Sequence, residues 1–187
     1  PVKWVFKVED HYESHFDKVT GQPYKFVRNI DEGGYIKNRI VDFDHAQNKA
    51  LVNDLKEGTN SSVDIEENIQ DLVSAYYYLR NNYNTETIQE GDVVELNIFF
   101  DSETFLFKLK YLGRETINTE FGKIKCIKFR PYVMAGRVFR EEESLTLWVS
   151  ADKNKVPIKI KADLQVGSLR ADLEALKGLK HPFEIQL

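Results

Sequence analysis

The sequence predicts a mainly β protein: a curled antiparallel sheet, of half-barrel or barrel-like form, with one α-helix packed on the sheet or at its opening. Three observations predict this fold. Apolar residues occupy every second position in many short segments, turn residues separate these segments at short intervals, and one segment alone has helical spacing. Strands that follow one another so closely form an antiparallel meander, because parallel strands need longer crossover connections.

A hairpin in the last part of the chain shows the alternation most clearly. Apolar residues alternate in its first arm, at residues 145–149, and in its second arm, at residues 156–166, and a polar turn at residues 151–155 joins the arms. After Gly167 the apolar positions slip by one residue, which predicts a β-bulge at this glycine. A bulge bends a strand, and we therefore expect the sheet to curl.

Shorter alternating segments predict the other strands. The ranges before the helix are 2–8, 15–19, 24–30, 35–43 and 49–55, and those after it are 94–100, 105–111, a short strand around Ile117, and 123–133. Gly33 and Gly34 mark a tight hairpin turn, and residues 101–103 mark another.

The one predicted helix runs from Asp64 to Asn81. Asp64 and Glu67 place negative charge in its first turn, where the helix dipole favours it. The residues at helical spacing are Ile65, Ile69, Leu72, Val73, Tyr76, Leu79 and Tyr83. Three consecutive tyrosines, 76–78, wrap round the axis, so at least one must face solvent or a cavity, and we interpret them as packing residues.

Length and charge restrict the class of protein. The 187 residues predict a single domain, residues 1–187, that needs no disulfide. Its net charge of −4 comes from interspersed acidic and basic residues, which argues against a nucleic-acid partner. No apolar run approaches the roughly 18 residues that span a bilayer, so we predict that the chain does not span a membrane. Met134 is the only methionine, so we expect a segment upstream of Pro1, for which a signal peptide is one explanation.

Residues able to coordinate metals or act as nucleophiles are scattered. The histidines are His11, His15, His45 and His181. On a strand, His11 and His15 would share a face but lie about 13 Å apart, too far to hold one ion. Cys126 stands among alternating apolar residues, which favours a buried small hydrophobe over a nucleophile.

The other chemical signals also favour structural roles. Ser74, Ser144, Ser150 and Ser168 lack a G-x-S-x-G context, and neither G-x-G-x-x-G nor a P-loop occurs. Carboxylate runs such as 66–67 and 141–143 are typical of solvated faces. We predict no catalytic, cofactor-binding or metal-binding residues and no cofactor. The aromatic content, 12 Phe, 9 Tyr and 2 Trp, leaves two alternatives open: a concave sheet face filled by these rings, or one open to an apolar ligand.

Several segments resemble a known family. They are residues 71–80 (DLVSAYYYLR), 129–131 (FRP), 136–139 (GRVF), 145–150 (LTLWVS), 156–158 (VPI) and 166–168 (VGS). From about Asp71 onward their order and spacing are similar to the domain of unknown function 3108 family. The resemblance implies an exported protein of the Gram-negative cell envelope, made with a signal peptide and with a strand or two before Pro1. It carries over no catalytic residue. The architecture is also similar to that of the half-barrel lipoprotein carriers of the periplasm.

These observations lead to three functional hypotheses. The first is a non-enzymatic periplasmic or envelope protein that binds an apolar ligand or lipid in its curled sheet. The second is an envelope scaffold or protein–protein interaction domain that uses sheet edges or exposed aromatic residues such as Trp148. The third, an enzyme, would require Arg130, Arg137 or Arg140 to meet carboxylates in a cleft. The ligand, the partner and the oligomeric state are left open.

Overall fold

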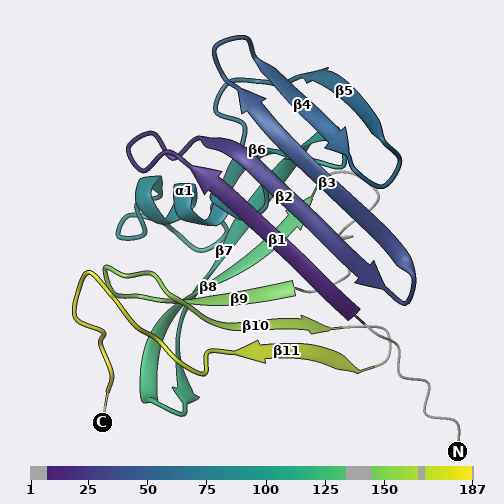
Figure 1. The fold of residues 1–187 in the computed structure, drawn as a ribbon. Helices are drawn as coiled ribbons and strands as arrows, with labels where there is room; N and C mark the ends of the chain where they lie inside the picture. The colour runs from purple at the N-terminus through teal and green to yellow at the C-terminus, as the bar shows by residue number, and fades with distance from the viewer. Residues whose placement is uncertain (1–7, 134–144, 164–166, 187) are drawn as a thin grey trace, which may run out of the picture. The chain divides into compact units, whose positions relative to one another are not determined.

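The computed structural model describes residues 8–133, 145–163 and 167–186 (Figure 1). These residues form eleven β-strands and one short α-helix, and the strands make two antiparallel sheets. The prediction of a mainly β fold with antiparallel pairing and one helix is confirmed, although the strands form two sheets and not one. Neither sheet closes into a barrel among the described strands, because each strand order ends in two edge strands. The curling of the sheet stays a prediction.

The chain divides into two compact units. The first unit comprises Pro1–Tyr83 and Leu96–Phe105, and the second comprises Asn84–Glu95 and Leu106–Leu187. The hairpin of β6 (Val93–Phe100) and β7 (Glu103–Thr119) is divided between the units. Its tip, Leu96–Phe105, belongs to the first unit. The single domain over residues 1–187 stays a prediction.

The first unit contains a five-stranded sheet in which every strand pairs with the next one along the chain. The strands are β1 (Val8–Phe16), β2 (Pro23–Glu32), β3 (Tyr35–Asp44), β4 (Lys49–Asp54) and β5 (Thr59–Asp64). Gly33 and Gly34 both have positive φ, at 60° and 94°, as a two-residue hairpin turn requires. The predicted meander and its glycine turn are confirmed here.

One face of this sheet is filled by a hydrophobic core. Phe26, Val41 and Val52 lie directly opposite one another on β2, β3 and β4, which puts their side chains on the same face. Ile65, Ile69 and Phe99 complete a cluster that also contains Phe43 and Ala50. Burying each large apolar side chain contributes roughly 1.5–3 kcal/mol. In this sheet the apolar face is therefore a packed interior.

The start of the chain differs from the prediction. Residues 9–14 were expected to separate two strands, yet β1 runs unbroken through them and pairs with β2 from Val8 opposite Glu32 to His15 opposite Lys25. These residues are polar because β1 is an edge strand, and edge strands tolerate charge. Residues 2–7 of the predicted first strand lie outside the described residues.

The helix, α1 (Ser74–Asn82), begins ten residues later than predicted. β5 extends through Asp64, and Ile65 and Ile69 reach the core from an irregular segment that pairs with β6 at Gln70. The helical spacing of Ile65 and Ile69 therefore predicted a helix, although these residues are buried in the core without being helical. The helix lies against β1, where the rings of Phe16 and Tyr77 have centroids 5.1 Å apart.

Asp71 explains where the helical turns begin. Its Oδ1 atom accepts hydrogen bonds from the backbone N–H groups of Val73 and Ser74, each at 2.8 Å. In return Ser74 Oγ accepts from the Asp71 N–H at 2.9 Å. This is the reciprocal arrangement of a capping box, with aspartate and serine in place of the usual pair.

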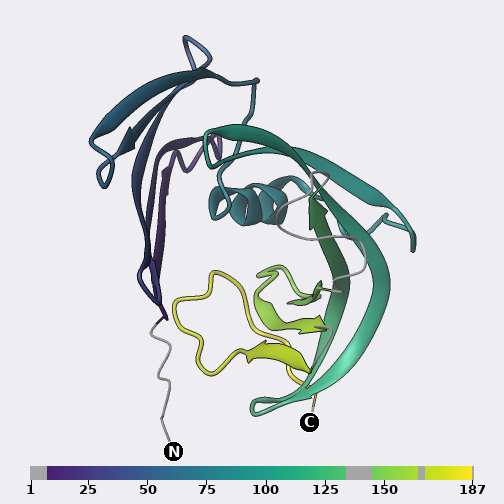
Figure 2. The same cartoon turned by 90° about the vertical axis from the view of Figure 1, so that its right-hand side faces the viewer.

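The second sheet has six strands in the order β11-β10-β9-β8-β7-β6. The further strands are β8 (Gly122–Val133), β9 (Leu145–Ser150), β10 (Pro157–Asp163) and β11 (Ser168–Asp172). β7 and β8 are long and run side by side (Figure 2). β7 includes both the strand predicted at 105–111 and the one around Ile117, joined by an irregularity between Tyr111 and Arg114.

The predicted bulge at Gly167 is wrong. The chain reverses between Asp163 and Ser168, which lie directly opposite each other, and β11 returns alongside β10. The slip in the apolar pattern therefore marks a turn between two strands. The register does shift in β10, but between Pro157 and Lys159 against β9. Residues 164–166 of the predicted second arm lie outside the described residues.

Candidate functional site

The six-stranded sheet carries a row of apolar side chains on one face. Directly paired residues on neighbouring antiparallel strands share a face. Pairing joins, from β7 to β11 in order, Tyr111, Phe129, Leu147, Ile160 and Ala171. We call these five residues the apolar row. Leu109 on β7 and Leu169 on β11 lie on the same face, two residues from members of the row.

Exposure increases along the apolar row toward β11. Tyr111 and Phe129 are buried, with ring centroids 5.8 Å apart. Leu147 is half-buried, whereas Ile160 is 40% exposed and Leu169 beside the row is 65% exposed. The β10–β11 end of this face thus presents aliphatic side chains to solvent, which suits it for contact with another apolar surface.

The opposite face of the same sheet is basic and contains Trp148. The indole is only 7% exposed, and its Nε1–H donates to Glu115 Oε2 at 3.1 Å. Lys128 Nζ and Lys159 Nζ lie 5.5 Å and 5.3 Å from the ring centroid. The hydrogen bond from Trp148 and the nearby Lys128 lower the pKa of Glu115. The prediction that Trp148 is an exposed contact residue is therefore wrong, because the ring packs in a core cluster with Ile124, Cys126 and Ile158.

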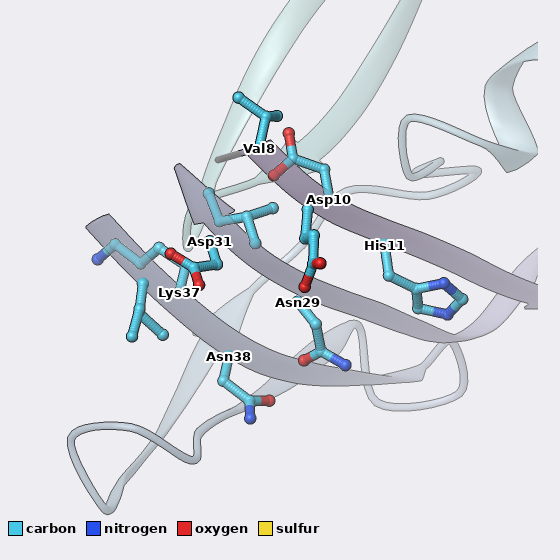
Figure 3. Close-up of a pocket in the computed structure, with 10 residues that line it drawn as sticks. Val8, Asp10, His11, Asn29, Asp31, Lys37 and Asn38 are labelled. Carbon is cyan, nitrogen blue, oxygen red and sulfur yellow. The ribbon is translucent and has the colours of Figure 1, made fainter. Parts of the chain in front are cut away.

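A groove of about 560 Å³ lies on strands β1, β2 and β3 (Figure 3). His11, Asn29 and Asn38 are directly paired across the three strands and lie side by side in it. Asp10, Asp31 and Lys37 also line the groove. Val8 and Ile36 also line it, so the groove offers both polar and apolar contacts.

His11 and His15 flank a carboxylate, that of Glu13. Glu13 lies between them on the same face of β1 and binds His11 Nε2 at 3.1 Å and His15 Nε2 at 2.5 Å. Hydrogen bonds from these two rings lower the pKa of Glu13. The His-x-Glu-x-His spacing was the available signal. In the part of the chain that the structure describes, no group of three acidic, histidine or cysteine side chains is arranged to hold a metal ion.

The described cysteine and two of the described serines are buried or hydrogen-bonded within the fold. Cys126 is fully buried, and its burial raises the thiol pKa to about 11, so the predicted role as a small buried residue is confirmed. Ser74 Oγ accepts from the Asp71 N–H at the start of the helix, and Ser150 Oγ donates to Asp152 at 2.9 Å. Ser168 is exposed on β11, whereas Ser144 lies outside the described residues.

The arginines proposed for a catalytic cleft are described only in part. Arg137, Arg140 and the carboxylates at 141–143 lie outside the described residues. Arg130 lies on β8, directly opposite Lys110 of β7 and not opposite a carboxylate. The geometry around Arg130 is thus that of a basic surface.

A charged cluster in the first unit holds the tip of the β6–β7 hairpin. Arg28 forms an ion pair with Asp101, and Arg39 bridges Asp101 at 3.2 Å and Asp54 at 2.8 Å. The Arg28 guanidinium also lies 4.4 Å from the ring centroid of Phe100. Asp101 has a positive φ of 50° in the hairpin turn, so the ion pairs hold a conformation that few non-glycine residues adopt.

The predicted polar turn at residues 151–155 is a buried anchor for the C-terminal segment. Asn154 is fully buried, and its Nδ2 donates to the carbonyl oxygens of His181 and Pro182 at 3.0 and 3.1 Å. The His181 N–H donates back to Asn154 Oδ1 at 3.0 Å. The buried amide of this turn is satisfied by a segment nearly thirty residues away, which no local pattern reveals.

Among the described residues, no helix has both the length and the apolar character needed to cross a bilayer. No curated protein and no solved structure matches this chain. A family model does match: that of the protein of unknown function (DUF3108), over residues 1–174. The match includes the N-terminal strands as well as the segments from Asp71 onward that carry the resemblance. The chain therefore belongs to the DUF3108 family.

Proposed function

We propose that this chain is a non-enzymatic protein of the bacterial cell envelope, exported to the periplasm, which binds an apolar ligand or lipid chain against the apolar row of a curled six-stranded sheet. The observation that carries the binding proposal is the row itself, with its exposed end at Ile160 and Ala171 and with Leu169 beside it. Export and periplasmic location are what the resemblance to the family implies.

The exposed half of the row sets the scale of the ligand. It extends over β9, β10 and β11, two inter-strand spacings or about 10 Å. Each Å² of aliphatic surface that a ligand covers contributes about 25 cal/mol. A linear hydrocarbon segment lying across the strands would contact Leu147, Ile160 and Leu169 without meeting a charged group on that face.

The roles of the reactive groups support a non-enzymatic function. The carboxylate of Asp71 accepts from Ser14 Oγ at 2.6 Å in addition to its two backbone donors. The thiol of Cys126 is buried with a raised pKa, which favours the unreactive protonated form. Both groups are thus engaged in holding the fold.

A pair of double variants tests the apolar row. Ile160→Ser with Leu169→Ser removes aliphatic surface from the row, whereas Lys161→Ser with Arg170→Ser changes the adjacent residues of the opposite face. Binding of a fluorescent fatty acid should weaken about tenfold in the first variant, or roughly 1.4 kcal/mol, and stay near the parent value in the second. Equal affinities for the two variants would refute the proposed site.

A second candidate function is favoured by strand β11. This strand lies at the edge of its sheet, and all five of its residues are exposed. An edge strand offers unpaired backbone groups to a strand of another protein. We propose envelope scaffolding through this edge as the alternative, which predicts stable capture of a protein partner that survives the Ile160→Ser, Leu169→Ser double change.

A further inference from the structure

Lys110 and Arg130 form a pair of like charges that faces no carboxylate among the described residues. They lie directly opposite each other on β7 and β8, on the basic face of the sheet. Lys110 is exposed and Arg130 is half-buried. The Arg130 Nε–H is buried and has no hydrogen-bond acceptor among the described residues.

Four other cations of this face are paired with carboxylates. Lys108 lies 2.5 Å from Glu95, Lys128 lies 3.4 Å from Glu115, and Lys161 lies 2.6 Å from Asp163. Arg170 pairs with Asp172. Lys110 and Arg130, by contrast, lie directly opposite each other and have no carboxylate partner among the described residues.

Arg28 differs from Arg130 in having a carboxylate partner. The Nε–H of Arg28 is also buried without an acceptor, but its Nη1 binds Asp101 and so its charge is neutralised. Like charges directly opposite each other destabilise a sheet, and a buried N–H without a partner adds a desolvation penalty. An anion bound between Lys110 and Arg130 would remove both penalties.

We propose that Lys110 and Arg130 bind a phosphate group. Two cations match the charge of a phosphate dianion, and the Nε–H and Nη–H donors of a guanidinium match two phosphate oxygens. The ammonium of Lys110 supplies a third donor from the exposed side. The phosphate is either a free ion or the headgroup of a lipid. The pair lies on the face opposite the apolar row, so this proposal does not rest on the proposed function.

The resonance of the Arg130 Nε–H provides a direct test. Titration of the full chain with inorganic phosphate, at constant ionic strength in chloride, should move this resonance in a saturable way. The Lys110→Gln variant should bind phosphate about tenfold more weakly, and Lys177→Gln, the same change at an exposed lysine outside the sheet, should bind like the parent. The absence of a saturable shift, or an unchanged affinity in Lys110→Gln, would overturn the proposal.

Vesicles distinguish the two sources of phosphate. Cosedimentation with phosphatidylglycerol vesicles that is reduced by Lys110→Gln and not by Lys177→Gln assigns the site to a lipid headgroup. Saturable binding of inorganic phosphate without such cosedimentation assigns it to a free ion. Either result supports the site, and neither depends on the serine variants that test the apolar row, so the two proposals can fail separately.

Discussion

The two sheets share an alternating sequence pattern, but their apolar faces differ in how far they are buried. In the five-stranded sheet, the apolar face of β2, β3 and β4 is covered by Ile65, Ile69 and Phe99 of the same unit. In the six-stranded sheet, the apolar row stays exposed at Ile160 and Ala171. Alternation thus shows which face is apolar, but the connecting segments decide whether that face becomes a core or a surface. We propose that the first face stabilises the fold and that the second binds a ligand.

The largest effect that separates the two faces is expected at Phe99. Its ring is almost fully buried and meets Phe43 edge to face at 5.8 Å. Phe99→Ala should lower the free energy of unfolding by about 3–5 kcal/mol, because it leaves a cavity. Leu169→Ala, at an exposed position, should change it by less than about 0.5 kcal/mol. Urea denaturation of both variants measures the difference, and similar losses would show that the two faces are not distinct.

Removing a carboxylate should destabilise the protein more in the first unit than in the second. Asp101→Asn removes the carboxylate that neutralises Arg28, whose side chain is 11% exposed, and should cost about 2 kcal/mol. Glu95→Gln removes a partner of Lys108 from a more exposed pair and should cost less than about 1 kcal/mol. Thermal denaturation at low and high salt checks this. A larger loss of stability for Glu95→Gln than for Asp101→Asn would contradict this prediction.

The smallest expected effect is a pH dependence from Asp71. Burial raises the pKa of its carboxyl group, although hydrogen bonds from Ser14 and Ser74 oppose the shift. Between the unfolded and the folded pKa the folded state binds more protons, so the free energy of unfolding falls as pH rises above about 4.

Asn at position 71 cannot titrate, so the stability of the parent relative to Asp71→Asn should decrease with rising pH. Urea denaturation of both proteins at several pH values measures this slope. An increase with pH would mean that the charged carboxylate is the stabilised form.

Local patterns predicted the parts of the fold that depend on neighbouring residues. The meander of the first sheet and the turn at Gly33 and Gly34 follow from period and backbone conformation. The start of α1 was missed because Ile65 and Ile69 satisfy helical spacing while lying in an irregular segment. The reversal after Asp163 was read as a bulge, because a turn and a bulge both shift the apolar phase by one residue.

The residues of the candidate site were harder to predict than the fold. Trp148 is buried in a cluster with Ile124, Cys126 and Ile158 from the two neighbouring strands, a contact that depends on register. The apolar row likewise appears only when five strands are aligned, since each of them contributes one of its members. Sequence alone identified the alternating apolar positions but not which of them stay exposed, because exposure depends on what covers the sheet.

The most direct test of the binding role is photo-crosslinking at Leu169 in the periplasm of a Gram-negative host. A photoreactive residue there should form a lipid-sized adduct, identified by mass spectrometry of the intact chain. The same residue at Arg170, on the opposite face, should not form it. A protein-sized adduct at position 169, or lipid adducts at both positions alike, would contradict a lipid-binding apolar row.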